Sequence, residues 1–357
     1  MLIGLICLFI VAPLLPLLPK SHWTVRFFDF VRLQTAIVQL VLVALAFIFW
    51  KQFSLVQIIA ITAITAVLLY QVILIRPYTP FYHRRKPKQQ FHKEQLTLVT
   101  ANVLQTNTNY DAFIELIKES KPHIFITMES DQKWDDAISM AFPEYIHTVK
   151  ATLDNFYGMH IYSKIPFKSA DVHYLVEKDI PSIHCEINYA NQLFNLIAIH
   201  PAPPSPTENE TSKERDAELM LVGKKCRESQ DATVVCGDLN DVVWSKTSRL
   251  FSKMTGYLDP RVGRGLYPSF HANYWLLRFP LDHLFYSKDL HVTQMKRLPR
   301  FGSDHFAMYY NIAFPLVDVD VPNPSMSKEE VQDIKEIIAD GRISARIAEQ
   351  EELEAMR

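Results

Sequence analysis

A short buried strand that leads directly into polar residues is predicted by the stretch Thr233-Val-Val-Cys-Gly-Asp-Leu-Asn240. Its β-branched run suits a strand, and Gly237 suits a sharp turn at the end of that strand. Asp238 and Asn240 would then lie at the edge of a sheet. Because strands hold side chains rigidly at a common edge, polar residues at strand ends are candidates for a functional site. A lone Asp-x-Asn is also typical of an ordinary Asx-turn, so the wider pattern has to distinguish the two.

The same arrangement recurs along the chain. Predicted strands adjoin polar residues at Asn102, Glu129, His200, Asp282, His283, Asp304 and His305. The carboxylate and amide oxygens suit Mg²⁺, which takes a few protein ligands together with water and substrate phosphate. The histidines are candidates for proton transfer near neutral pH, and a neighbouring carboxylate can fix the tautomer of one of them. This combination is what the hydrolysis of a phosphoester requires, with a metal ion and a His–Asp pair acting on water.

The order of these motifs resembles that of the endonuclease/exonuclease/phosphatase superfamily. The matching segments are Thr100-Ala-Asn102, Thr127-Met-Glu129, Gly158-Met-His-Ile-Tyr-Ser163, Ile199-His200-Pro201, Gly237-Asp238-Leu239-Asn240, Leu281-Asp282-His283 and Gly302-Ser303-Asp304-His305. The likeness covers Leu96–Ile312. It implies a deoxyribonuclease-I-like fold, which is an α/β (α+β) four-layer α-β-β-α sandwich with two mixed β-sheets. The residues alone, with more strands than helices, indicate only a mixed sheet architecture.

The resemblance also implies a role for each metal-site and water-site residue. Glu129 would bind the catalytic Mg²⁺, with Mn²⁺ as the alternative, helped by Asn102 and Asp304. Asp238 would orient or activate the attacking water, and Asn240 would contact the scissile phosphate.

The three histidines are expected to have different roles. By the same resemblance His305 would pair with Asp282, and His200 would match the second histidine of the deoxyribonuclease and sphingomyelinase branches. Abasic-site endonucleases carry a Tyr-containing segment there, which argues against a DNA-repair activity. His283 is expected to pack or hydrogen-bond near the sheet edge.

The substrate is not fixed by the fold, since the superfamily covers DNA, RNA, inositol phosphates and phospholipids. Residues 97–313 contain 22 Lys and Arg against 26 Asp and Glu, which argues against a broadly basic nucleic-acid groove. Residues 246–300 are a basic exception. Within them Arg261, Arg264 and Arg278 are candidates to bind substrate phosphate, and a solvated basic face that complements anionic lipid is the alternative.

Residues 1–78 are predicted to be a membrane region with helices at about 2–18, 35–50 and 55–75. Pro13 and Pro16 interrupt the first, which leaves a signal-peptide core as the alternative. The pattern predicts an integral protein of a bacterial-type inner or plasma membrane. Lys and Arg gather after the first and third segments, so the positive-inside rule places the soluble domain in the cytoplasm if the first segment spans. The three of the four cysteines that lie outside the membrane region have no close pairing, which agrees with a reducing compartment.

The remaining segments flank a predicted catalytic domain at 95–314. Residues 79–94 form a basic linker, either solvated or in contact with membrane lipids. Residues 315–357 form a helical tail that begins with a capping box at Ser327 and Glu330. An appended helical hairpin, a helix that binds a protein partner and a solvated tail all remain open.

Three functions follow. A membrane-anchored phosphodiesterase or phosphatase, acting on a phosphate ester that is lipid-linked or free, is favoured because tethering raises local substrate concentration. A membrane-tethered endonuclease or exonuclease acting on DNA or RNA is the first alternative. The second is a non-catalytic scaffold, against which the complete set of polar residues argues.

A content of 48% hydrophobic and 21% charged residues excludes a disordered chain.

Overall fold

The computed structural model describes residues 1–83, 89–229, 231–317 and 322–355. The chain divides into two compact units. One comprises Met1–Arg84 together with the short segments Pro204–Ser212 and Val262–Gly265. The other comprises Arg85–Pro203, Lys213–Arg261 and Leu266–Arg357.

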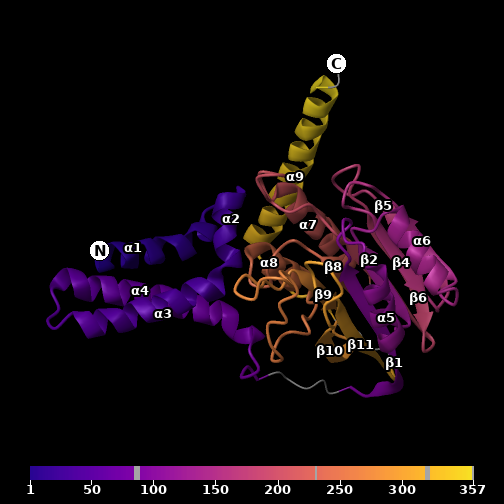
Figure 1. The fold of residues 1–357 in the computed structure, drawn as a ribbon, viewed down its shortest axis with the longest axis horizontal. Helices are drawn as coiled ribbons and strands as arrows, with labels where there is room; N and C mark the ends of the chain where they lie inside the picture. Colours follow the sequence, from indigo (N-terminus) through magenta and orange to yellow (C-terminus); the bar gives the residue numbers. More distant parts are fainter. Residues whose placement is uncertain (84–88, 230, 318–321, 356–357) are drawn as a thin grey trace. The chain divides into compact units, whose positions relative to one another are not determined.

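The second unit is built on two mixed β-sheets (Figure 1). The six-stranded sheet has the order β10 (His291–Arg297), β11 (Met308–Pro315), β1 (Phe91–Asn102), β2 (Ile124–Met128), β4 (Met159–Ser163) and β3 (His147–Ala151). The five-stranded sheet has the order β5 (Phe167–His173), β6 (Ser182–Tyr189), β7 (Gln192–Ile199), β8 (Ala232–Asp238) and β9 (Asp282–Tyr286). Strands β1 and β2 are parallel, as are β7 and β8, and the other pairs are antiparallel.

Alternation of apolar side chains along the strands produces four layers. Leu96 and Leu98 of β1 belong to the core between the two sheets. Val99 and Ala101 face the other way and pack in the cluster with α5 (Tyr110–Ser120) and α6 (Gln132–Ala141). On the second sheet, Ile197 packs in the cluster with α7 (Lys213–Glu228) and α8 (Lys246–Thr255). The predicted α-β-β-α sandwich is therefore confirmed.

The parallel pairs bring the polar strand ends together. Asn102 is the register partner of Met128, so the residue after β2, Glu129, lies at the same edge as the end of β1. In the second sheet, Asp238 at the end of β8 is the register partner of Asp282 at the start of β9. Each sheet thus presents polar residues at one end of two neighbouring strands.

The C-terminal tail is a single helix, α9 (Lys328–Ala355), and not a helical hairpin. Its start is capped as predicted, because Ser327 and Glu330 exchange hydrogen bonds between backbone N–H and side-chain oxygen. The helix continues through Gly341, where a Cβ would lie 2.3 Å from that of Ala217 on α7. Gly341 therefore permits α9 to approach α7 and does not end the helix. Partner binding by the tail stays a prediction.

In its described residues, the first unit contains four helices and two 3₁₀ turns. They are α1 (Leu2–Val11), η1 (Ala12–Leu17), α2 (Trp23–Phe30), α3 (Arg32–Phe49), α4 (Leu55–Ile75) and η2 (Arg76–Tyr78). By length and composition, Arg32–Phe49 and Leu55–Tyr78 could cross a membrane, and the first apolar segment, Leu2–Leu17, is shorter. Its prolines lie in the 3₁₀ turn. The helix Trp23–Phe30 was not expected.

The interior of this helical unit is partly polar. Gln71 donates to Oε1 of Gln39 at 2.7 Å, Thr35 donates to Gln71 at 2.9 Å, and Gln39 donates to the carbonyl of Phe9 at 2.6 Å. Gln39 and Gln71 are fully buried. Large apolar side chains of the same helices are exposed, among them Ile37, Leu40, Phe47, Ile48, Ile58, Ile59 and Ile73.

Candidate active site

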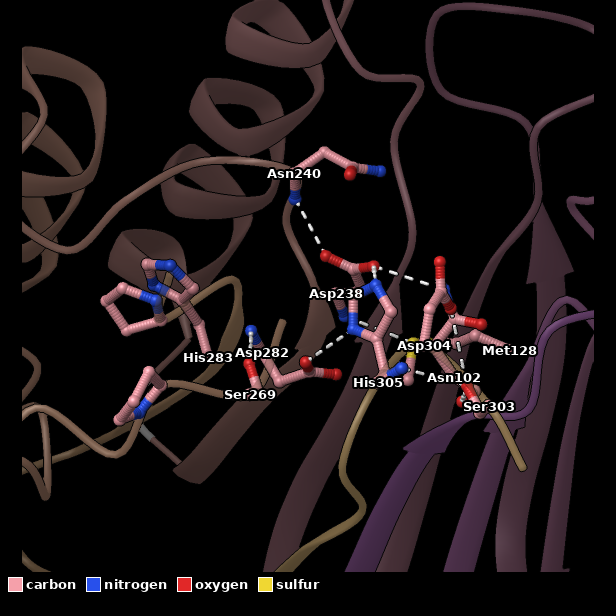
Figure 2. Close-up of polar contacts among 12 residues, drawn as sticks. Asn102, Met128, Asp238, Asn240, Ser269, Asp282, His283, Ser303, Asp304 and His305 are labelled. Atoms are coloured by element: carbon pink, nitrogen blue, oxygen red, sulfur yellow. Dashed lines mark hydrogen bonds and ion pairs between the residues drawn. The ribbon is translucent and has the colours of Figure 1, made fainter. Parts of the chain in front are cut away.

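His305 lies between two carboxylates of the second sheet (Figure 2). Its Nδ1 is 2.9 Å from Oδ2 of Asp282, and its Nε2 is 3.4 Å from Oδ2 of Asp238. All three side chains are buried. Burial opposes the charged imidazole, but the two carboxylates overcome it and raise the pKa of His305 to about 10. The geometry therefore favours an imidazolium next to an anionic Asp238.

Two serines hold this pair in place. The sequence analysis assigned no role to either of them, although Ser303 lies in the matching segment Gly302-Ser303-Asp304-His305. Ser269 accepts a hydrogen bond from the backbone N–H of Asp282 at 3.0 Å. Ser303 accepts one from the N–H of His305 at 3.0 Å and donates to the carbonyl of Asn102 at 2.8 Å. Ser303 thereby ties the loop of His305 to the end of β1.

Asn102 connects the carboxylates of both sheets. Its Nδ2 lies 2.6 Å from Oε1 of Glu129 and 3.2 Å from Oδ2 of Asp238. A second cross-sheet contact is made by Met128, whose sulfur accepts from the N–H of Asp238 at 3.1 Å. Burial raises the pKa of Glu129, although His200 and Asn102 act in the opposite direction. Glu129 has a φ of 56°, in the left-handed region, a strained conformation of the kind that clusters at functional sites.

His200 lies close to both Asp238 and Glu129. Its Nδ1 is 3.1 Å from the carbonyl oxygen of Asp238, and its Nε2 is 3.8 Å from Oε1 of Glu129. The ring lies 5.5 Å from that of Tyr157, a residue that sequence reasoning missed. Proximity of His200 and His305 holds the pKa of buried Asp238 below its usual range despite the desolvation that would raise it.

Asp238 makes an Asx-turn with the backbone of Asn240, which also lies at the edge of the site. The N–H of Asn240 donates to Oδ1 of Asp238 at 3.0 Å, and its Nδ2 donates to the carbonyl of Pro201 at 3.1 Å. Buried Arg215 donates to the carbonyl of Asn240 at 2.6 Å. The Asx-turn and the candidate site therefore involve the same residues, Asp238 and Asn240, and the two interpretations of this motif do not exclude one another. Nothing in the polar helix sequence around Arg215 had marked it.

Asp304 and His283 are the two remaining polar residues that the sequence analysis placed at strand ends. The carbonyl of Asp304 accepts from the N–H of Ala272 at 2.6 Å, and its Oδ1 is 3.4 Å from Oγ of Ser303. His283 is fully buried, with Nε2 2.9 Å from the carbonyl of Asp241, so it has the packing role that was expected.

The three arginine candidates differ in their environments. Arg261 is fully buried, forms an ion pair with Asp259 at 2.8 Å and donates to the carbonyl of Asp282 at 3.3 Å. It supports the backbone of the site and is not available to phosphate, which corrects the expectation for this residue. Arg264 belongs to the first unit. Arg278 is half-buried, with its guanidinium 5.1 Å from the centre of the Phe306 ring.

The predicted metal ligands are Glu129, Asn102 and Asp304. Among the residues that the structure describes, no three His, Cys, Asp or Glu side chains form a ready metal cluster. Glu129 does offer a half-buried carboxylate, next to the amide of Asn102, and a bound cation would offset the desolvation that raises its pKa. One carboxylate with neutral oxygens fits Mg²⁺, which keeps several waters, better than it fits zinc.

Comparisons with known proteins identify the family and the fold. Residues 99–305 match the model of the Endonuclease/Exonuclease/phosphatase family. D. rerio TDP2 complexed with single strand DNA product has a TM-score of 0.54 and 14% identity, over 62% of this chain and 99% of that one. A family protein from Bacteroides thetaiotaomicron has a TM-score of 0.51 and 18% identity, over 64% and 98%. One from Beutenbergia cavernae has a TM-score of 0.52 and 16% identity, over 62% and 72%. A search of curated protein sequences gives no match.

Proposed function

The chain belongs to the endonuclease/exonuclease/phosphatase family, whose members are generally hydrolases of phosphoester bonds, and we propose that it is a membrane-anchored, Mg²⁺-dependent phosphodiesterase or phosphatase. The observation that carries the proposal is His305 between Asp282 and Asp238 at 2.9 Å and 3.4 Å. An imidazolium beside a buried carboxylate can stabilise phosphate oxygens while the carboxylate acts on water.

In this mechanism Asp282 orients His305 and keeps it charged through the hydrogen bond at Nδ1. The proton at Nε2 of His305 then stabilises charge on a phosphate oxygen. Asp238 accepts a hydrogen bond from the attacking water and takes its proton as the water oxygen bonds to phosphorus. The P–O bond to the leaving group breaks in the same displacement, and the leaving alkoxide takes a proton from solvent. Asn240 contacts the phosphate. Glu129, with Asn102 and Asp304, would hold Mg²⁺ or Mn²⁺, which supplies positive charge to the phosphate oxygens when bound.

Membrane anchorage is supported by the inside-out pattern of the helical unit. Buried Gln39 and Gln71 bond to one another, while Phe47 and Ile48 on the same helix as Gln39 are exposed. A helical bundle in water would show the reverse, whereas helices in lipid bury polar groups and expose apolar ones. By the distribution of Lys and Arg, we place the catalytic unit on the cytoplasmic side.

A direct test measures hydrolysis of bis-nitrophenyl phosphate and nitrophenyl phosphate by the full chain in detergent. We expect turnover with Mg²⁺ or Mn²⁺, loss of turnover with EDTA, and recovery when the metal is restored. The variant Glu129→Gln should be inactive. Metal-independent turnover, or full activity of Glu129→Gln, would contradict the proposal.

A nuclease is the second candidate, because the structural neighbour from D. rerio is complexed with a single-strand DNA product. Against it stands the excess of acidic residues over residues 97–313. Adding a labelled single-stranded oligonucleotide to the same assay separates the two: Mg²⁺-dependent cleavage of the oligonucleotide in preference to the small diesters would support the nuclease.

A further inference from the structure

The loop that follows Phe270, whose ring lies 4.9 Å from that of His305, exposes a run of large apolar side chains. Tyr274, Trp275, Leu276 and Leu277 are 60%, 75%, 60% and 51% exposed. Among the described residues of the second unit, no other three consecutive large apolar side chains are exposed. A patch of this kind is unfavourable in water and marks a surface that contacts something else. We call Tyr274–Leu277 the apolar tip.

The apolar tip is held by its own backbone hydrogen bonds. The N–H of Leu277 donates to the carbonyl of Tyr274, the N–H of Tyr274 donates to that of His271, and the N–H of His271 donates to that of Leu277. Exposure is therefore the result of a closed turn that directs the side chains outward. Because unpaired backbone groups are costly in an apolar medium, a turn with internal bonds suits entry into a membrane interface.

Three arginine side chains, Arg278, Arg297 and Arg300, lie near the apolar tip. Arg278 and Arg297 both contact one aromatic ring, with guanidinium carbons 5.1 Å and 4.3 Å from the centre of Phe306. Arg300 contacts the side chain of Asn273, immediately before the tip. Arg297 and Arg300 are exposed. We call these three arginines the basic collar; an apolar tip with such a collar complements the apolar layer and the anionic headgroups of a lipid surface.

The tip is joined directly to the catalytic residues. Phe270 forms a bridge with His305, and their rings are 4.9 Å apart. The N–H of Ala272 donates to the carbonyl of Asp304, and Arg278 donates to the carbonyl of Ala272 at 3.1 Å. A surface that received the tip would therefore lie next to His305 and Asp304.

We infer that the apolar tip enters the interfacial layer of an anionic membrane, so that the site takes a phosphoester in a lipid headgroup as its substrate. The substrate assignment rests on the proposed hydrolase function; the insertion of the tip does not. Trp275 is the side chain most suited to an interface, since its ring is apolar and its N–H is polar. An aromatic platform for single-stranded nucleic acid is less well matched, because Leu276 and Leu277 have no ring on which a base could stack.

Insertion can be measured without any assay of activity. In a Cys7→Ser background the remaining cysteines are buried, so Leu276→Cys can be labelled with an environment-sensitive dye. The matched control is Ile146→Cys, which lies on an exposed site of the same unit. The full chain is placed in vesicles of phosphatidylcholine, with or without phosphatidylglycerol. We expect a blue shift and quenching by spin-labelled lipid at position 276 only, and more strongly with phosphatidylglycerol. A dye at 276 that iodide reaches as readily as one at 146 would overturn the inference.

The substrate class is tested with Trp275→Ser/Leu276→Ser and the control pair Met140→Ser/Ile146→Ser, both at exposed positions. The tip double variant and the control double variant should both hydrolyse bis-nitrophenyl phosphate at the rate of the parent protein. Release of headgroup from phosphatidylglycerol vesicles should fall about tenfold or more in the tip variant alone, through KM. Equal rates of headgroup release in the two variants would overturn the lipid assignment, as would a loss restricted to cleavage of a single-stranded oligonucleotide. A parent protein that cleaves neither diester nor lipid would refute the proposed function, while the dye experiment would still decide the insertion.

Discussion

Nδ1 of His305 lies 2.9 Å from Oδ2 of Asp282, although the two residues are 23 positions apart in the chain. Asp282 begins β9, and Asp238, its register partner at the end of β8, lies on the other side of the same ring. The imidazole is thus enclosed by two carboxylates that a single pair of strands positions. Orientation and charge of His305 come from the same two contacts.

This geometry predicts the outcome of a double-mutant cycle. His305→Ala should lower kcat for bis-nitrophenyl phosphate by about two orders of magnitude or more, the usual scale for an acid–base group. Asp282→Asn should cause a similar loss, since the amide removes the charge that orients His305. The double variant should be little slower than either single one, because the pair acts as a unit. Losses that multiply would show that the two residues act independently.

The second prediction concerns Glu129 and metal binding without turnover. Adding Mg²⁺ should raise the melting temperature of the full chain, because a ligand that binds only the folded state stabilises it. In Glu129→Gln the increase should be absent, since the neutral amide loses the charge that attracts the ion. Glu144→Gln, at an exposed glutamate that lies 3.8 Å from Lys164, is the matched control and should keep the increase. An unchanged shift in Glu129→Gln would place the metal elsewhere.

Sequence patterns located the strand-end residues because buried strands have strong apolar runs, and Asn102, Glu129, His200 and Asp238 directly follow such runs. They missed β3, β5 and β10, whose exposed or half-buried residues give no continuous apolar run. Helix α8 was missed for a different reason, because its buried face includes Thr247 and Ser248.

The side chains that support the site were harder to predict. Arg261 belongs to a type that is usually exposed, and only the folded chain brings its guanidinium to Asp259 and to the carbonyl of Asp282. Ser269, Ser303 and Arg215 act through backbone groups of residues distant in sequence. Spacing along the chain carries no signal for such contacts.

The third prediction tests the contact between α9 and α7. In an exposed helix interior, Gly→Ala normally stabilises by about 0.5–1 kcal/mol. Gly341→Ala should instead destabilise by about 1–3 kcal/mol, because its Cβ would lie 2.3 Å from Cβ of Ala217 and 2.5 Å from the carbonyl oxygen of Lys213. Chemical denaturation measures the change, with exposed Asp340→Ala as the control on the same helix. A stabilised Gly341→Ala would mean that α9 does not pack on α7 in solution.

The last prediction concerns a buried carboxyl group away from the site. Glu218 on α7 is almost completely buried, and its Oε1 has no hydrogen-bond partner among the described residues. Burial, with a smaller contribution from Glu177, raises the pKa of Glu218 to about 8 from an ordinary value of 4.5. The folded state therefore holds this proton more tightly than the unfolded state. The resulting stabilisation is complete below the unfolded pKa and is lost as the pH rises through the folded pKa.

Glu218→Gln keeps the shape of the side chain and removes the titration. Its free energy of unfolding should nearly equal that of the parent at about pH 5 and exceed it by about 1 kcal/mol or more at about pH 9, where the parent buries a carboxylate. Denaturant unfolding of the full chain in detergent at the two pH values measures the difference. Glu228→Gln, at an exposed position on the same helix, should show no pH-dependent difference. If the advantage of Glu218→Gln is the same at both pH values, Glu218 is not protonated in the folded protein, and the difference comes from packing instead.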